Sequence, residues 1–388
     1  MAKIVLLAER MVLGLLGRIL RRVPAAARNR PVKRSLWAGT PLLTLPVKAR
    51  AERLLGVRAD TLVYNTYFIT DAFDYNLQRW MRIPVLNRLA PYVVLLWACL
   101  RYQRFHFFCD HGLLQHTGTG FNPAELRFLH TLGKELFFWT YGADVRTQER
   151  TRILGEFNCC LECPNPGRAC ICNDKAGQEN MARLHEYATA VFAMGDMLEY
   201  TPGSRNDLFY WPLDLLADQG RRYLPRYPPA GATAPVRVVH APNHRRFKGT
   251  RYLLAAVDRL RRQGLPVELR LVEGVPNREA LEVYRTADVI FDQCLIGFHG
   301  YFALEAMAMG KPVMAYIRDP ARYLLHPEEC PLINTPADRV EAVLRELVTD
   351  RPLLHRLGRQ GRQYVEKYFS VTAFAERLQT AYRELKAA

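Results

Sequence analysis

Residues 287–316 read ADVIFDQCLIGFHGYFALEAMAMGKPVMAY, in which a short apolar run, a loop with two glycines and a helical segment follow one another. The run 289–292 predicts a buried strand, a helix is expected over 301–309, and a second strand is expected over 313–316. A strand, a glycine loop and a helix in this order are typical of phosphate-binding α/β units. The reason is that the first N–H groups of a helix have no partner within the helix and attract anions.

The same alternation extends outward from this stretch over most of the chain. Further strands are expected over 62–64, 105–109, 136–140, 190–194, 236–240 and 267–272, and further helices over 124–132, 178–187, 252–263 and 278–286. Alternating strands and helices predict parallel, doubly wound sheets. Because 388 residues exceed what one hydrophobic core usually organises, two such domains are expected.

A proline-rich segment, 224–235, interrupts the alternation and is expected at or near the linker. The predicted boundaries are a basic helix over 1–23, an N-terminal Rossmann-like domain over 24–220, a linker over 221–235, a C-terminal Rossmann-like domain over 236–367 and a C-terminal helix over 368–388 that returns to the N-terminal domain.

The net charge of +16 is concentrated at the N-terminus, where residues 1–50 hold eleven Lys or Arg and one acid. The absence of a nucleic-acid-binding motif argues against nucleic acid and favours an anionic membrane surface. Residues 1–23 are expected to form an amphipathic helix that lies on such a surface, although docking on its own domain is an equal alternative. We find no signal peptide and no apolar run long enough to cross a bilayer. A cytoplasmic chain, peripheral on the inner face of the cell membrane, is therefore expected.

Two passages of the C-terminal half carry residues suited to a nucleotide. Glu305, early in the helix of the opening stretch, can accept hydrogen bonds from a ribose diol, although it can also be a favourable early-helix charge. Lys248, with Arg245 or Arg246, can neutralise a leaving diphosphate, although basic loop residues are often only solvated.

Residues 305–313 match the E-A-M-A-x-G-x-P-V run of GT-B-fold glycosyltransferases, and the chain resembles the retaining family 4. Glu305 matches the glutamate that binds the nucleotide ribose in that family. The family's other glutamate, eight residues earlier, contacts the donor sugar, and this chain has Gly297 there. The family's arginine five residues before the lysine is also replaced, by Asn243.

The resemblance implies a GT-B fold of two Rossmann-like domains facing across a cleft. It also implies transfer, with retention, from a UDP- or GDP-sugar to a glycan or lipid-linked acceptor. Residues 35–41, SLWAGTP, are expected after the first strand, so that Gly39 approaches the diphosphate. The candidate donor-binding residues are Gly39, Gly297, His299, Gly300, Tyr301 and Glu305, and the candidate catalytic residues are Lys248, Arg245, Arg246, His106 and His111.

His106 and His111 lie near a predicted strand end, where either can orient the acceptor or act as a base. No D-x-D motif is present, so no catalytic metal is expected. Two alternatives stay open at this point. One is a sugar-nucleotide epimerase of the same fold, and the other is a non-catalytic scaffold at the membrane surface.

Five of the nine cysteines lie within residues 159–172, in the segment NCCLECPNPGRACIC at 158–172. The spacing of Cys160 and Cys163, with Cys170 and Cys172 after a proline-glycine turn, predicts a structural zinc site in a loop of the N-terminal domain. Free or redox-active thiols are the main alternative. Disulfides are less favoured in a reducing compartment.

Overall fold

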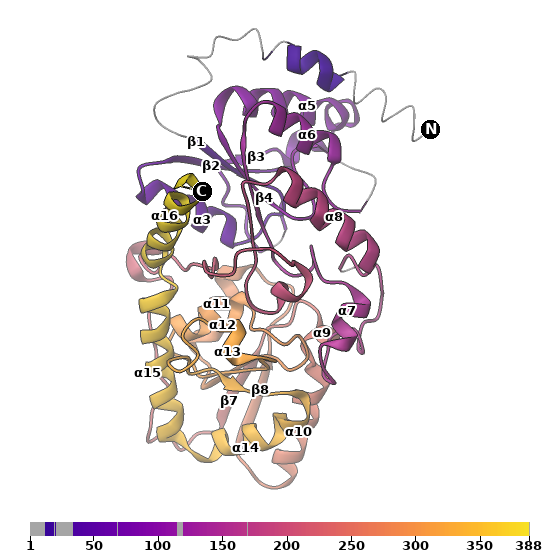
Figure 1. Ribbon diagram of the computed structural model, residues 1–388. Coiled ribbons are helices and arrows are strands. Elements are labelled where there is room, and N and C mark those ends of the chain that lie inside the picture. The colour runs from indigo at the N-terminus through magenta and orange to yellow at the C-terminus, as the bar shows by residue number, and fades with distance from the viewer. Residues whose placement is uncertain are drawn as a thin grey trace. The chain divides into compact units, whose positions relative to one another are not determined.

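A computed structural model describes residues 12–18, 20, 34–67, 69–114, 119–168 and 170–387. The chain divides into two compact units (Figure 1). Unit 1 comprises Met1–Thr147, Ala169–Leu208 and Ala375–Ala388, and unit 2 comprises Gln148–Arg168 and Phe209–Phe374.

The described part of unit 1 contains a six-stranded parallel sheet of order β3-β2-β1-β4-β5-β6. The strands are β1 (Arg34–Ala38), β2 (Arg58–Val63), β3 (Tyr75–Asn76), β4 (Arg104–Phe108), β5 (Glu135–Trp139) and β6 (Ala190–Phe192). The helices are α3 (Thr44–Leu54), α4 (Gln78–Met81), α5 (Pro84–Arg101), α6 (Pro123–Thr131), α8 (Asp174–Tyr187) and most of α16 (Val371–Ala387). In this doubly wound order the direction reverses between β1 and β4, and ligands bind at the carboxyl ends of such strands.

A buried carboxylate, Glu52 of α3, ties the elements of unit 1 together. It accepts hydrogen bonds from the side chains of Ser35, Trp37, Arg104 and Tyr382, the last from α16. Burial alone would raise the pKa of Glu52. The interactions with His106, Arg104 and Tyr382 outweigh burial and hold that pKa well below its usual range. The C-terminal helix is therefore bonded into the core of unit 1.

Unit 2 contains, in its described residues, a five-stranded parallel sheet of order β11-β10-β9-β7-β8. Its strands are β7 (Val236–His240), β8 (Val267–Leu271), β9 (Val289–Gln293), β10 (Val313–Ala315) and β11 (Ile333–Asn334). Its helices are α7 (Gln148–Ile153), α9 (Arg245–Lys248), α10 (Thr250–Arg262), α11 (Asn277–Arg285), α12 (Tyr301–Ala308), α13 (Pro320–Tyr323), α14 (Val340–Thr349) and α15 (Arg351–Tyr368). The direction reverses between β7 and β9, which again marks a ligand-binding edge.

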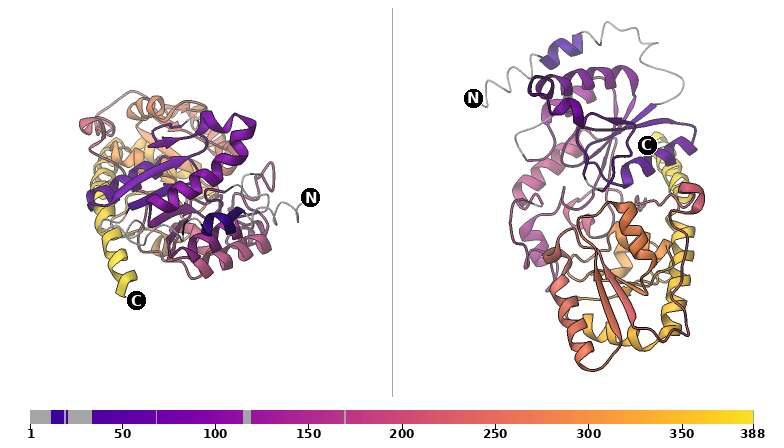
Figure 2. Two further views of the ribbon diagram at one scale, coloured as in Figure 1. Left: turned by 90° about the horizontal axis from the view of Figure 1, so that it is seen from above. Right: turned by 180° about the vertical axis from the view of Figure 1, so that it is seen from behind.

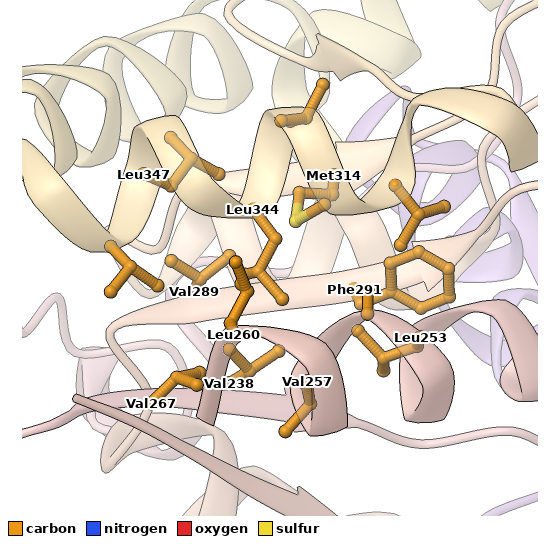
Figure 3. Close-up of a cluster of buried hydrophobic side chains, with 14 of the residues drawn as sticks. Val238, Leu253, Val257, Leu260, Val267, Val289, Phe291, Met314, Leu344 and Leu347 are labelled. Carbon is orange, nitrogen blue, oxygen red and sulfur yellow. The ribbon is translucent and has the colours of Figure 1, made fainter. Parts of the chain in front are cut away.

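The core of unit 2 is formed by alternate strand residues and one face each of α10 and α14 (Figure 3). Val238, Leu253, Phe291, Met314 and Leu344 are among its fully buried members. Helix α12 packs against α15, and helices flank the sheet on both sides in the view from behind (Figure 2). Both faces of the sheet are covered, which explains why the central strands β9 and β10 are buried along their whole length, whereas the edge strand β8 alternates apolar and charged residues.

The strands and helices that were expected between residues 236 and 316 lie within a few residues of their observed bounds, whereas three other expectations differ from the structure. Residues 35–38 belong to strand β1, so SLWAGTP is not a loop that follows the first strand. The second segment of unit 1 ends at Leu208, so the expected linker, residues 221–235, lies within unit 2. Residues 148–168, expected in the N-terminal domain, belong to unit 2 because Phe157 packs on its core and Glu162 forms an ion pair with Arg251.

Most of the expected N-terminal helix lies outside the described residues. Residues 12–18 are helical; Leu13 and Leu20 are buried and Leu15 is exposed. None of the helices that the structure describes is both long and apolar enough to span a membrane.

Candidate functional site

The carboxyl edge of the unit 2 sheet gathers the predicted phosphate-binding groups around one carboxylate. Lys248, at the end of α9, donates to Asp292 Oδ1 of β9 over 2.6 Å. The backbone N–H of Gly300, the residue that precedes α12, donates to Asp292 Oδ2 over 2.5 Å. The Asp292 carboxylate is fully buried. The Asp292 carboxylate therefore occupies an anion position, to which the ammonium group of Lys248 and the helix-start N–H of Gly300 both donate.

Glu305 lies one turn into α12 and is buried. Its Oε1 accepts hydrogen bonds from Asn277 Nδ2 at 3.0 Å and from the Tyr223 hydroxyl at 3.2 Å, while Oε2 makes none with the residues that the structure describes. Burial raises the pKa of Glu305 to about 7 in spite of these donors and the nearby Arg222. One oxygen of a fixed carboxyl group is thus left to bond a hydroxyl group of a ligand.

The other predicted donor-binding residues of unit 2 surround the start of α12. Gly297 has φ +92° and its carbonyl accepts from the backbone N–H of Arg318. His299 is buried, with ring contacts to Phe298 and Trp211. The Tyr301 hydroxyl donates to the Pro212 carbonyl at 2.9 Å. His299 and Tyr301 therefore fix the start of α12 to residues 211 and 212.

The three predicted cations of the α9 segment have different environments. Arg245 is exposed and forms a bidentate ion pair with Glu273, and Arg246 is exposed. Lys248 alone among them contacts the sheet edge, through Asp292. Of the three predicted cations, Lys248 is thus the one that the structure places at the sheet edge.

A second polar cluster lies at the carboxyl ends of β1, β4 and β5 in unit 1. Asp110 Oδ2 accepts from the hydroxyl groups of Thr40 at 3.1 Å and Tyr141 at 2.9 Å, and Oδ1 lies 3.1 Å from His111 Nδ1. The His111 side chain is 43 % exposed. Burial alone would lower the pKa of His111, but the charge of Asp110 and its hydrogen bond outweigh burial and raise it. His111 is thus a partly accessible histidine with a raised pKa, at the edge where the strand order reverses.

The residues around this cluster serve to shape it. Asp144, buried, accepts from the backbone N–H groups of Cys109, Tyr141 and Gly142, and burial raises its pKa to about 7. Gly39, next to Thr40, has φ +118°, a conformation that favours glycine. The chain therefore turns sharply at Gly39, directly after β1 and beside the Asp110–His111 pair.

His106, predicted as a catalytic candidate, is instead a core residue. Its ring stacks on Trp37 at a centroid distance of 3.8 Å, Nδ1 accepts from Trp139 Nε1, and the side chain has no exposed surface. Burial lowers the pKa of His106 to about 4. It does not reach the strand end, because His106 is the central residue of β4.

The four cysteines predicted to bind zinc are divided between the two units. Cys160 and Cys163 belong to unit 2, and Cys170 and Cys172 belong to unit 1. Within the described ranges, the His, Cys, Asp and Glu ligand atoms close enough to share one ion are those of exposed His326, Glu328 and Glu329, and no cysteine is among them. The zinc site stays a prediction, which metal analysis of the purified protein would test.

The raised pKa of Glu305 predicts a pH-dependent contribution to stability. A buried carboxyl group whose pKa rises from 4.5 to about 7 on folding stabilises the protein fully below pH 4.5, and this contribution is lost as the pH rises through 7. At about 1.4 kcal/mol per pKa unit, the loss is about 3 kcal/mol. We expect the free energy of unfolding of Glu305→Gln, relative to the wild type, to rise by about that amount between pH 4 and pH 8 in urea titrations. Parallel pH profiles for the two proteins would contradict this assignment.

Comparison with known proteins supports the architecture. No family model matches the sequence, and no curated protein matches it. Among solved structures, sucrose-phosphate synthase from Thermosynechococcus elongatus is similar over 92% of this chain and 99% of its own, at 14% identity and a TM-score of 0.59. The catalytic domain of starch synthase IV from Arabidopsis thaliana, solved with ADP and acarbose, is similar over 92% of this chain and 100% of its own, at 11% identity and a TM-score of 0.54. With its two Rossmann-like units, the chain has the GT-B glycosyltransferase fold, as the resemblance implied.

Proposed function

We propose that the protein is a retaining glycosyltransferase that moves a sugar from a UDP- or GDP-sugar to a glycan or lipid-linked acceptor. The observation that carries the proposal is the convergence of Lys248 and the Gly300 N–H on one anion position, with Glu305 one turn along the same helix. The spacing suits a nucleoside diphosphate whose phosphates lie at the start of α12 and whose ribose reaches Glu305.

In the proposed reaction the bond between the anomeric carbon and the donor phosphate breaks, and a bond to the acceptor oxygen forms on the same face of the sugar. The acceptor's proton passes to the departing phosphate. Lys248 and the N–H of Gly300 stabilise the charge that grows on the diphosphate, and Asp292 gives up these donors when the nucleotide binds. The protein supplies positioning and charge, and no covalent intermediate is needed.

The polar cluster of unit 1 is proposed as the acceptor-side site. His111, held by Asp110 and partly exposed, can bind an acceptor hydroxyl or an anionic group next to it. His106 has no place in this proposal, because it is enclosed in the core.

Binding of the donor is the first test of the proposed function. Thermal unfolding is measured with UDP, GDP, ADP and their sugars at saturating concentration. A ligand at a hundred times its Kd stabilises a protein by about 2.7 kcal/mol, which at this size gives a shift of several degrees. Stabilisation by one nucleoside diphosphate and its sugar is expected. Absence of any shift would contradict the proposal.

A non-catalytic scaffold of the same fold is the second candidate, and one observation favours it. Asp292 neutralises Lys248 and occupies the Gly300 N–H in the protein alone. If Asp292 holds these groups permanently, no nucleotide binds. The same panel distinguishes the two candidates, because the scaffold gives no thermal shift.

Peripheral membrane association is proposed for one surface of unit 1, formed by α4 and α5. Exposed apolar side chains of this surface are Trp80, Ile83, Val85, Leu89 and Val93. In α5, Val85, Leu89 and Val93 recur every fourth residue and so share one face. Arg79, Arg82 and Arg88 lie among them in the sequence. An apolar stripe with arginines and an interfacial tryptophan suits the headgroup region of an anionic bilayer.

The double substitution Val85→Asp/Leu89→Asp is expected to weaken binding to vesicles of phosphatidylglycerol and phosphatidylcholine by at least tenfold. It removes apolar area that the bilayer would bury, and it adds negative charge, which the anionic lipids repel. Deleting residues 1–33 should weaken binding further and remove most of its salt dependence. The control is Leu254→Asp, an exposed apolar residue of α10 in unit 2, which should have no effect on sedimentation with vesicles. Unchanged binding of the double variant would rule out the α4–α5 surface.

A further inference from the structure

Arg318 follows strand β10 and its guanidinium is enclosed by two glycines of unit 2. An ideal Cβ on Gly297 would lie 2.6 Å from Arg318 Nη2, and one on Gly155 would lie 3.5 Å from Arg318 Nε. Gly297 also has φ +92°, which a residue with a side chain rarely adopts. The absence of side chains at 155 and 297 therefore creates the space that the guanidinium fills.

Among the residues that the structure describes, none balances the charge of Arg318. Its Nη2 donates to the Ile296 carbonyl at 3.1 Å, while Nε and Nη1 are buried and have no hydrogen-bond partner in the part of the chain that the structure describes. No carboxylate of those residues lies within ion-pair distance. Burying donors of a cation without an acceptor is costly, so an anion that binds here from solution would be strongly favoured.

A second position for negative charge thus exists at the same sheet edge as the Lys248 position. Lys248 follows β7, Arg318 follows β10, and β9 lies between these strands in the sheet. Since neighbouring strands are about 4.8 Å apart, the ends of β7 and β10 are about 10 Å apart. The two positions for negative charge therefore follow strands on either side of β9 at one sheet edge, where one ligand with two anionic groups can address both.

We infer that the donor is a nucleoside diphosphate hexuronate, whose sugar carboxylate binds Arg318 while its diphosphate binds Lys248 and the Gly300 N–H. The inference rests on the proposed function. A neutral hexose offers only hydroxyl groups at this position and leaves the buried charge unbalanced, whereas a carboxylate supplies both the acceptor atoms and the charge. Discrimination then comes from Arg318, because the hydroxyl groups of a neutral sugar can accept its hydrogen bonds but cannot balance its buried charge.

Calorimetry with matched ligands tests the inference. The ligands are UDP-glucuronate with UDP-glucose, GDP-mannuronate with GDP-mannose, and UDP and GDP alone. The wild type is expected to bind one hexuronate at least tenfold more tightly than its neutral counterpart. Arg318→Met should abolish this preference and change the affinity for the nucleoside diphosphate alone by less than threefold. Arg318→Lys, which keeps the charge, should retain part of the preference, and Arg262→Met, which changes an exposed cation of α10, should retain all of it.

The outcomes separate the inference from the proposed function. An equal loss of affinity for nucleoside diphosphate and hexuronate in Arg318→Met would mean that Arg318 binds a phosphate, and it would overturn the inference. A wild type that binds a nucleoside diphosphate without preferring its hexuronate would overturn the inference and leave the proposed function intact. A wild type that binds none of the six compounds would overturn both.

Discussion

Replacing Lys248 by alanine is expected to lower kcat/KM for sugar transfer by about a hundredfold or more, the usual effect of losing one group that stabilises transition-state charge. The ammonium group is the side-chain cation that contacts the anion position beside α12, through its 2.6 Å bond to Asp292. Its removal leaves the departing diphosphate with the helix-start N–H alone. Steady-state kinetics with the donor identified by the nucleotide panel measure the loss.

The controls separate catalysis from folding. Arg245→Ala and Arg246→Ala change exposed cations of the same segment and should each alter kcat/KM by less than about threefold. Lys248→Ala also leaves the buried Asp292 without its ion-pair partner. The double variant Lys248→Met/Asp292→Asn removes both charges and should unfold at nearly the wild-type temperature while remaining inactive. Near-normal turnover of either lysine variant would show that the phosphate lies elsewhere.

Replacing Glu305 by alanine is expected to weaken donor binding by about a hundredfold. The variant loses the carboxyl oxygen that we propose binds a ribose hydroxyl, and it also leaves the donors of Tyr223 and Asn277 unpaired in a buried position. Glu305→Gln keeps an acceptor for these two donors and should lose about tenfold. Calorimetric titration with the nucleoside diphosphate measures both variants.

An exposed acid in the first turn of a helix serves as the matched control. Glu279→Ala, in α11, removes such a charge without touching the site and should leave donor binding within about twofold of the wild type. If Glu305→Ala bound as well as Glu279→Ala, Glu305 would be only a favourable helix charge. Circular dichroism of each variant confirms that the fold is kept.

The sequence predicted the elements of unit 2 better than the boundaries of the units. Strands β7, β9 and β10 are largely apolar and β8 alternates apolar and charged residues, and both patterns are local in the sequence. Strand β1 was missed because SLWA is short and ends beside a glycine. Residues 148–168 were assigned by their order in the chain, whereas their contacts with Tyr316 and Arg251 are long-range.

Local motifs marked some residues of the candidate site in the sequence, whereas the distant residues that contact them were not identified from it. Lys248, Gly300 and Glu305 lie in recognisable segments. Asp292 is separated from Lys248 by 44 residues and Tyr223 from Glu305 by 82, so no local pattern connects them. Gly297 was identified as a departure from the family run, but Arg318, which fills its side-chain space, required the structure.

The most direct test of the central claim is a crystal structure with the nucleoside diphosphate that the panel identifies. We expect the diphosphate within hydrogen-bond distance of Lys248 Nζ and the Gly300 N–H, with Asp292 displaced from both, and a ribose hydroxyl on Glu305. A nucleotide bound instead at the carboxyl edge of the unit 1 sheet, beside Asp110 and His111, with the Lys248–Asp292 pair intact, would contradict the claim.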